Sequence, residues 1–507
     1  MEQTTHNTQT RKTKIVCSIG PACDSDGTIR AMIEAGMNVA RFNFSHGTHE
    51  WHAQAMERVR RIAAELSVPV ALMLDTKGPE IRTGMTEEGK DVRITAGERV
   101  IVTADGATCR SADGANPCRI SLSWKEAADR LKPGMRILIA DGLVALEVRG
   151  ASGGEIECVA LNAGVFGSRK NVNLIGVHAG LPILGEQDKD DLRFGAEMDV
   201  DFVAASFVSF AREVVEIKDF LCSVGSNARV IAKIENGEGL SDVAAIARES
   251  DGVMVARGDL GVQLPEEQIP LAQKKIIRAC RRAGKPVITA TQMLESMVKN
   301  PRPTRAELTD VANAVFDGTD AVMLSGETAN GSYPVEAVRT MALVARTTED
   351  SEIYRERMRA SGRRPPKGSD TAALVAHSAY TLAEDIGAAA IIAPTMRGNT
   401  ARLLGEFRPD QVVIAVTPDE RVRRQLALQW GVVSVPCAVA DSPDTMIKNA
   451  VTRALEKGAV SLNDTAVVCA GLPLESPSVA NLIRVVKAGE VVGLGHTNDD
   501  EIQEKLK

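Results

Sequence analysis

The 507-residue sequence is poor in the features that mark several classes of protein. Aromatic residues make up only 3% of the chain and the net charge is −7, so it lacks the stacking side chains and the basic surface of nucleic-acid-binding proteins. No apolar run approaches the length of a membrane span, and residues 1–10 are polar, without the apolar centre of a signal peptide. We therefore expect no nucleic-acid partner, no membrane partner and a cytoplasmic location, with residues 1–11 as an N-terminal tail.

Cysteine is also used without a pattern. The nine cysteines are scattered, odd in number and mostly inside apolar runs, and they include no CxxC pair of the kind found in metal or redox sites. The hydrophobic content of 44% and the charged content of 25% are those of a soluble globular protein. Because single cores rarely exceed about 250 to 300 residues, the length predicts several domains.

Residues 231–261 carry the clearest pattern. Two short apolar runs each end abruptly in charged residues, the first in Lys233 and Glu235 and the second in Asp259, with a helical stretch between them. This is the rhythm of a parallel sheet, and it brings the three side chains to the carboxyl ends of neighbouring strands. Carboxylates without histidine or cysteine favour Mg²⁺ or Mn²⁺ over zinc, and the lysine suggests a phosphorylated or enolic substrate. One such run alone is more often a surface Lys–Glu pair and a loop aspartate.

The same rhythm recurs along the chain. Apolar runs at residues 13–20, 38–47, 70–74, 201–205, 286–290 and 320–324, with the two above, give eight strands, most of which end in polar residues. An open sheet can also contain eight strands, but polar residues at so many strand ends favour one shared mouth. We predict a (β/α)₈ TIM barrel formed by residues 12–78 and 181–346.

Two further domains are expected from changes in this pattern. Residues 79–180 show short alternating stretches separated by Gly-containing turns, which predicts an inserted all-β lid domain. The charged, Pro-containing stretch 349–367 suggests a domain boundary. Residues 368–507 again alternate strands and helices, which predicts a C-terminal open α/β domain.

Seven segments are similar to motifs of the pyruvate kinase family, in that family's order and spacing: TKIVCSIGPA, NVARFNFSHG, LDTKGPEIRTG, IAKIENGEG, ARGDLGV, TATQMLESM and LSGETANGSYP. The resemblance covers almost the whole chain. It implies transfer of the phosphoryl group of phosphoenolpyruvate to ADP, giving pyruvate and ATP, by a barrel with an inserted lid and a regulatory C-terminal domain. It also implies a homotetramer.

The resemblance assigns roles around the mouth of the barrel. Glu235 and Asp259 are expected to hold the divalent ion, Lys233 to lie against the phosphoryl group, and Arg41 to bind phosphate through its bidentate fork. Phosphoryl transfer needs mainly positioning and positive charge, which these groups supply.

The substrate carboxylate is expected at Thr291 and at the backbone N–H groups of Gly258 and Asp259. A threonine in the position of Thr291 is also a plausible helix N-cap, which is compatible with that role.

The resemblance further implies a K⁺ site and a nucleotide site. The K⁺ ligands are small oxygen-bearing residues that, taken alone, are more typical of turns: Asn43, Ser45, Asp75 and Thr76. The nucleotide is expected at Asn43, His46 and Arg82. Glu80 is the family's K⁺-requiring form of its position, where a lysine goes with K⁺ independence.

Two positions depart from the family pattern. Gln187 stands where the family commonly has a lysine, which puts one nucleotide phosphate contact in question and leaves Lys189 as a stand-in. The second departure is Arg397, in a βα turn where the usual residue is serine. That turn is a candidate cradle for a phosphorylated allosteric effector, with AMP or a sugar monophosphate slightly favoured over fructose 1,6-bisphosphate; taken alone, it is an ordinary turn. Its residues are Thr395, Arg397, Gly398, Asn399 and Thr400.

Two other functions fit parts of the sequence. One is another Mg²⁺-dependent barrel acting on an enolate, which has no need of a lid carrying Arg82. The other is a sugar-phosphate sensor with an inactive barrel, against which the intact Lys233, Glu235, Asp259 and Thr291 argue.

Overall fold

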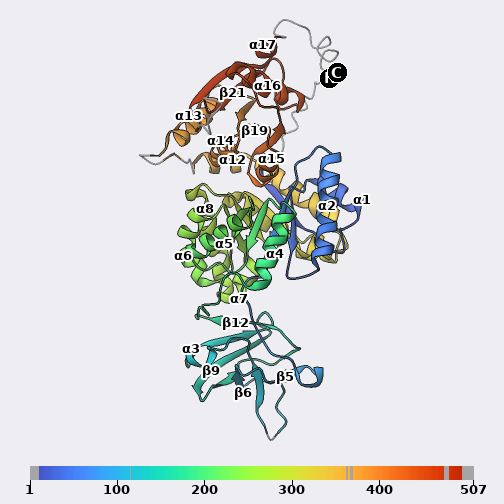
Figure 1. Cartoon of the computed structure of the whole chain (residues 1–507), viewed down its shortest axis with the longest axis vertical. Coiled ribbons are helices and arrows are strands. Elements are labelled where there is room, and N and C mark those ends of the chain that lie inside the picture. Colours follow the sequence, from blue (N-terminus) through green and yellow to red (C-terminus); the bar gives the residue numbers. More distant parts are fainter. Residues whose placement is uncertain (1–10, 115, 361–363, 366–368, 473–478, 494–507) are drawn as a thin grey trace.

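The computed structural model describes residues 11–114, 116–360, 364–365, 369–472 and 479–493. A central barrel lies between a β-rich lid at one end and an α/β domain at the other (Figure 1). The polar residues 1–10 of the predicted tail and parts of the predicted boundary stretch lie outside the described residues.

The central body is a closed barrel in which every pair of neighbouring strands is parallel. Its strands are short runs of apolar and small residues that are buried along nearly their whole length, because both the lumen and the surrounding helices cover them. In barrel order they are β1 (Lys14–Ser18), β17 (Ala321–Leu324), β16 (Val287–Ala290), β15 (Gly252–Ala256), β14 (Arg229–Ile234), β13 (Phe202–Ala205), β3 (Ala71–Asp75) and β2 (Val39–Asn43).

Helices follow the strands and form the outer layer of the barrel. Several begin at the residues that sequence rules favour, such as Ser25 and Thr304, whose hydroxyls accept hydrogen bonds from backbone N–H groups of the first turn. The helices are α1 (Asp26–Ala35), α2 (His49–Glu65), α4 (Glu186–Glu197), α5 (Ala211–Ser223), α6 (Gly237–Glu249), α7 (Arg257–Gln263), α8 (Ile269–Ala283), α9 (Arg305–Asp317), α10 (Gly326–Ala329) and α11 (Pro334–Asp350), with 3₁₀ turns η2 (Glu266–Gln268) and η3 (Glu295–Val298).

The lid is inserted between β3 and β13, which are hydrogen-bonded neighbours in the barrel. It contains a seven-stranded sheet and a separate strand pair with their own buried core, and a short helix and 3₁₀ turn interrupt the predicted all-β pattern. In sheet order the strands are β4 (Ile81–Arg82), β12 (Asn171–Ile175), β8 (Arg136–Ile139), β9 (Val144–Ser152), β10 (Glu155–Ala160), β6 (Arg99–Thr103) and β7 (Cys118–Ser121), with the pair β11 (Gly164–Phe166) and β5 (Val92–Ile94), and the helical turns are η1 (Glu87–Gly89) and α3 (Ala127–Arg130).

The C-terminal domain is an open sheet with helices on its faces. Four strands are parallel, as predicted, and a fifth, β22, pairs antiparallel with β21 at one edge. In sheet order the strands are β20 (Val432–Pro436), β19 (Val412–Thr417), β18 (Ala390–Pro394), β21 (Thr465–Ala470) and β22 (Leu482–Lys487), and the helices are α13 (Thr371–Asp385), α14 (Asn399–Glu406), α15 (Glu420–Gln425), η4 (Leu426–Leu428), α16 (Pro443–Glu456) and α17 (Ala488–Val492).

These three bodies confirm the predicted fold class. The predicted boundary stretch, residues 349–367, contains the end of α11 and a further helix, α12 (Glu352–Ala360). Tyr354 and Met358 of α12 are buried against Val315 and Trp430, because their spacing of four residues puts them on one helix face. Among the described residues, no helix combines the length and apolar character that crossing a membrane requires.

Candidate active site

The polar residues that follow the barrel strands gather around Lys233. This lysine is on β14 and is buried, with Nζ 2.9 Å from Asp75 Oδ1, 3.1 Å from Glu235 Oε1 and 2.7 Å from Ser206 Oγ. Burial opposes its charged form, but the two carboxylates outweigh it and raise the pKa of Lys233 above its ordinary value. The group is therefore a fixed cation at the end of the barrel that carries the strands' carboxyl termini.

Arg41 approaches the same cluster from β2. Its Nε donates to Asp75 Oδ2 over 2.6 Å and its Nη1 donates to Ser18 Oγ over 2.7 Å. Burial alone would raise the pKa of Asp75, but Arg41 and Lys233 lower it below the usual range. Asp75 thus holds an arginine and a lysine side by side, which is the cation density that an anionic phosphoryl group requires.

Glu235 and Asp259 form a close pair of carboxyl groups next to Lys233. Burial raises the pKa of Glu235 to about 7 against the influence of Lys233, and the charge of Asp259 adds to the rise. Burial also raises the pKa of Asp259, and the two groups are close enough to share a hydrogen bond. Glu235 Oε2 also accepts the N–H of Phe207 over 2.5 Å. One lysine does not fully neutralise the two buried carboxyl groups. Such a pair of carboxyl groups is typical of a cation-binding site.

The pair fits a hard divalent ion better than zinc. In the described part of the chain, no group of three or more His, Cys, Asp or Glu side chains has a metal-binding arrangement. Mg²⁺ commonly uses only one or two protein carboxylates and keeps water or substrate oxygens as its other ligands. Glu235 and Asp259 can therefore serve Mg²⁺ or Mn²⁺ but do not make the closed set of a structural zinc site.

Thr291 lies directly after β16, opposite the start of α7. Its Oγ1 accepts the N–H of Gly258 over 2.9 Å, and both Thr291 and Gln292 have positive φ values, 68° and 52°. Arg257 holds this strained turn by donating to the Thr291 carbonyl oxygen. A non-glycine residue in this region is uncommon and often marks a functional position. The hydroxyl and the first turn of α7 face one another across the edge of the site.

The predicted K⁺ ligands lie at the ends of two neighbouring strands. Asn43 and Asp75 are register partners on β2 and β3, and Thr76 follows Asp75. The amide oxygen of Asn43 also accepts the N–H of Ser45 over 3.1 Å, so these residues form a turn as well.

Comparison with known proteins agrees with this geometry. A family model described as the pyruvate kinase barrel domain matches residues 10–338, and one described as the pyruvate kinase alpha/beta domain matches residues 373–486. The chain belongs to the pyruvate kinase family. A pyruvate kinase of Clostridium acetobutylicum is 44% identical over 483 residues, which cover 94% of this chain and 99% of that protein.

Other relatives give the same result. A pyruvate kinase of Staphylococcus aureus is 44% identical over 487 residues, covering 96% of this chain and 82% of that protein. The crystal structure of a pyruvate kinase from Cryptosporidium parvum superposes with a TM-score of 0.89 at 41% identity, covering 94% of this chain and 96% of that one. The chain is accordingly a phosphotransferase of the pyruvate kinase type, and the comparisons favour neither another barrel enzyme acting on an enolate nor a sensor with an inactive barrel.

Two of the residues predicted to contact nucleotide lie together, because the N–H of His46 donates to the Asn43 carbonyl oxygen over 3.2 Å. His46 is exposed just beyond β2. Arg82, at the root of the lid, donates to Glu80 through Nε over 2.9 Å and through Nη2 over 2.5 Å, and it donates to the Arg169 carbonyl oxygen over 2.9 Å. The arginine that the pyruvate kinase resemblance assigns to nucleotide is therefore already paired within the lid root.

Gln187, which stands where the pyruvate kinase family commonly has a lysine, contacts a carboxylate in the structure. Its amide donates to Asp191 Oδ1 over 3.0 Å, and His49 Nε2 contacts the same oxygen at 2.7 Å. Lys189, the suggested stand-in, pairs instead with Glu186 at 2.8 Å. Neither side chain supplies a free cation at the position of the family's lysine.

Sequence reasoning missed two serines of the site. Ser206 contacts both Lys233 and Thr76, donating to the Thr76 carbonyl oxygen over 2.7 Å, and Ser18 receives a hydrogen bond from Arg41. Both are strand-end residues, Ser206 directly after β13 and Ser18 at the end of β1, so the rule that identified the others could have found them. The predicted effector turn, residues 395–400, is in the C-terminal domain, at the opposite end of the barrel from the lid (Figure 1).

Proposed function

We propose that the chain transfers the phosphoryl group of phosphoenolpyruvate to ADP with Lys233, Arg41 and Thr291 as its catalytic residues. The observation that carries this proposal is the position of Lys233 Nζ within 3.1 Å of both Asp75 and Glu235, with Arg41 on the other side of Asp75. Two fixed cations at one buried point match a transferring phosphoryl group, whose catalysis is mainly positioning and charge neutralisation.

Lys233 lies against the phosphoryl group in this mechanism, and Arg41 binds its outer oxygens through two N–H donors. Thr291 and the backbone N–H groups of Gly258 and Asp259 orient the substrate carboxylate. The hydrogen bond from Gly258 N to Thr291 Oγ1 supports this assignment, because it holds the hydroxyl next to the first turn of α7. Phe207 and Ile183, which line a cleft together with Asp259 on the lid side, limit access of water to this edge.

Two metal ions complete the proposal. Glu235 and Asp259 would hold Mg²⁺ or Mn²⁺, because burial raises the pKa values of both carboxyl groups despite Lys233 and a second cation would stabilise their charged forms. When bound, this ion neutralises charge on the phosphoryl and enolate oxygens. Asn43, Ser45, Asp75 and Thr76 would hold K⁺, supported by the pairing of Asn43 with Asp75 across β2 and β3.

The nucleotide is proposed to enter between the lid and the barrel, where Asn43, His46 and Arg82 contact it. Arg82 exchanges its pairing with Glu80 for the nucleotide phosphates, which places the lid root under the control of ADP. A coupled assay of pyruvate formation with phosphoenolpyruvate, ADP, Mg²⁺ and K⁺ tests the proposed reaction. No pyruvate above the enzyme-free rate, from folded protein, would rule it out.

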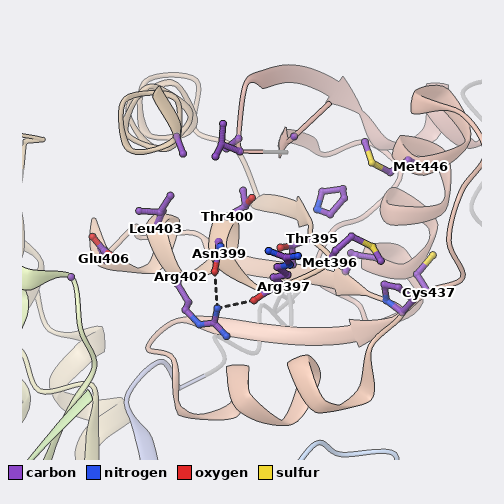
Figure 2. A pocket seen from close by; sticks show the side chains of 18 of the residues that line it. Thr395, Met396, Arg397, Asn399, Thr400, Arg402, Leu403, Glu406, Cys437 and Met446 are labelled. Atoms are coloured by element: carbon purple, nitrogen blue, oxygen red, sulfur yellow. Dashed lines mark hydrogen bonds between the residues drawn. The ribbon is translucent and has the colours of Figure 1, made fainter. Parts of the chain in front are cut away.

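We also propose that a phosphorylated metabolite activates the enzyme at the turn of residues 395–400. Figure 2 shows this turn and α14 beside a cavity of about 440 Å³. Arg402 Nη1 donates to the Arg397 carbonyl oxygen over 2.8 Å and to Asn399 Oδ1 over 3.1 Å, while its buried Nη2 has no hydrogen-bond partner among the residues that the structure describes. Burial and the nearby Arg229 lower the pKa of Arg402 to about 9. Asp251 opposes this shift in the pKa of Arg402, and an anion in the cavity would stabilise the charged guanidinium further.

The residues that line the cavity indicate which chemical class of effector it can bind. Met396 of the turn, Leu403 of α14 and Met446 of α16 also line the cavity, so the site offers cations for one phosphate and apolar side chains beside them (Figure 2). This combination favours a nucleoside monophosphate such as AMP, whose base has an apolar face, over a sugar monophosphate or fructose 1,6-bisphosphate.

Titration of AMP, ribose 5-phosphate, glucose 6-phosphate and fructose 1,6-bisphosphate at sub-saturating phosphoenolpyruvate tests the effector site. Thr400→Glu is expected to abolish activation, but Thr400 is buried, so Arg397→Glu at the exposed neighbouring position is the better variant. Activation should disappear while basal turnover is unchanged. A flat response of the parent enzyme to all four compounds would leave the turn without a regulatory role.

Assembly and location complete the proposal. The family resemblance supports a homotetramer in the cytoplasm, and the nine reduced cysteines, seven of them buried, are compatible with a reducing compartment. Light scattering coupled to gel filtration gives the assembly directly, and a monomeric or dimeric mass would contradict the tetramer.

A further inference from the structure

The floor of the catalytic barrel is made by the C-terminal domain. Ala427 and Leu428 of η4 are 6% and 1% exposed, and they belong to the same buried cluster as side chains of the barrel lumen. The lumen residues in that cluster come from all eight strands: Val16, Val39, Ala71, Met73, Phe202, Ala204, Ile231, Met254, Ile288, Ala290, Ala321 and Met323. Their neighbour Leu426 is equally buried but packs into the core of its own domain.

Polar contacts hold η4 against the amino-terminal ends of the strands. Arg424 Nε donates over 2.8 Å to Asp201, just before β13, and the other oxygen of Asp201 accepts the backbone N–H of Leu72. Gln425 Oε1 accepts from Arg229, the first residue of β14, over 2.8 Å. Lys14, the first residue of β1, donates to the carbonyl oxygen of Val432 over 2.7 Å. The site residues lie at the opposite ends of these strands.

The lumen side chains of this buried cluster separate the floor from the site: on β3, Ala71 and then Met73 precede Asp75. Met73 and Ile231 belong to the floor cluster, and each precedes a site residue on its strand by two positions: Asp75 on β3 and Lys233 on β14. Residues two apart on a strand point to the same face and are about 6.6 Å apart along it. The buried cluster that contains Leu428 therefore extends to the lumen side chains next to Asp75 on β3 and next to Lys233 on β14.

We propose that Leu428 is a positioning residue for phosphoryl transfer, acting through this lumen layer. Protein interiors are close-packed, and methionine side chains re-pack readily when a neighbour is removed. With Leu428 truncated, Met73 and its neighbours can move down, which loosens the layer that fixes Lys233 and Asp75. A displacement on the order of 1 Å at a reacting centre can lower turnover by about 10². The inference rests on the proposed function of Lys233.

The experiment compares Leu428→Ala with Leu426→Ala in the full-length protein. The two leucines lie in the same 3₁₀ turn and are equally buried, but one packs into the barrel and the other into its own domain, so Leu426→Ala controls for lost stability. Well below both melting temperatures, Leu428→Ala should lower kcat about ten- to hundredfold with little change in the KM for phosphoenolpyruvate. Leu426→Ala should leave kcat near the parent value. The volume-conserving Leu428→Met should keep most of the parent kcat that Leu428→Ala loses.

Hydrogen exchange gives a readout that does not depend on activity. The carboxyl ends of β3 and β14 should lose protection in Leu428→Ala and keep it in Leu426→Ala. If Leu428→Ala does not fold, Leu428→Val gives the same comparison with a smaller cavity. Equal kcat and equal protection of β3 and β14 in the two variants would overturn the inference. An inactive parent enzyme would instead contradict the proposed function, and the exchange comparison would still test the floor.

Discussion

Replacing Lys233 by methionine keeps the length of the side chain and removes its charge. Nζ lies about 3 Å from two carboxylate oxygens, and a phosphoryl oxygen at a similar distance would interact with it by about 5 kcal/mol at an effective dielectric constant of about 20. Only the part of this interaction energy that is gained between the bound substrate and the transition state affects kcat. Loss of one preorganised donor typically costs about 10² to 10³, or ~2.7 to 4 kcal/mol, and a full cation in a dry site costs more.

The same contacts predict that Lys233→Met leaves the fold nearly intact. Asp75 keeps its ion pair with Arg41, and removal of the lysine raises the pKa of Glu235 further, which favours the neutral form of this carboxyl. The variant therefore avoids most of the 3–5 kcal/mol that an unpaired buried charge would cost. Loss of the Lys233 charge removes a repulsion that opposes the divalent metal ion, whereas protonation of Glu235 competes with that ion. Because these two effects oppose each other, metal binding should change little.

The assay is kcat at saturating phosphoenolpyruvate, ADP, Mg²⁺ and K⁺, with thermal unfolding measured on the same preparation. Lys274→Met is the control, because Lys274 is a half-exposed lysine that pairs with Asp317 on the outside of the barrel. Lys233→Met should lose several orders of magnitude in kcat while Lys274→Met loses none. Turnover of pure Lys233→Met within tenfold of the parent would refute the role of the lysine.

Four other outcomes are expected. Asp259→Ala should abolish Mg²⁺-dependent turnover, and residual Mg²⁺-stimulated activity would argue against the metal assignment. Gln187→Lys should lower the KM for ADP; an unchanged KM would mean that the missing lysine is no deficit in nucleotide binding. Glu80→Lys should remove the K⁺ requirement that the parent shows in tetramethylammonium buffer, and full parent activity without K⁺ would contradict the K⁺ site. Binding of Mn²⁺ to the enzyme, followed by paramagnetic resonance, should weaken about tenfold per pH unit below pH 7 and level off above pH 8, because a proton competes for Glu235, whose pKa is raised to about 7.

The sign of the pH effect on stability follows from the same group. The folded, metal-free protein holds the Glu235 proton more tightly than the unfolded chain, whose ordinary value is 4.5. The contribution of Glu235 to the free energy of unfolding therefore falls as the pH rises from 4.5 to about 7. Saturating Mn²⁺ should cancel this trend, which thermal unfolding at pH 5 and pH 7 with and without the metal can check.

The barrel and much of its mouth were predictable because they follow local rules. Each strand is a short apolar run, and a polar residue directly after it points into a shared mouth, so Lys233, Asp75 and Thr291 could be singled out from order along the chain. Ser206 obeys the same rule but was missed, since a single serine after a strand is common in turns and gives no distinct signal.

Features that depend on contacts between domains could not be read from the sequence. Residues 426–428 are an ordinary apolar Leu-Ala-Leu turn, and nothing local distinguishes the leucine that enters the barrel from the one that stays in its own domain. The pairing of Arg82 with Glu80 also depends on the rotamers of two flexible side chains. The helix of residues 352–360 carried a signal in Tyr354 and Met358, which its charged residues obscured.

The origin of the barrel floor has a consequence for synthesis on the ribosome. The last barrel strand ends at Leu324, but the leucine that fills the bottom of the lumen lies roughly 100 residues later, so it is translated on the order of 5 to 20 s afterwards. During that interval the nascent barrel has all its strands and an open, apolar lower end. Chaperones that bind exposed apolar surface should therefore engage chains stalled between residues 346 and 428, and release them once the C-terminal domain has emerged.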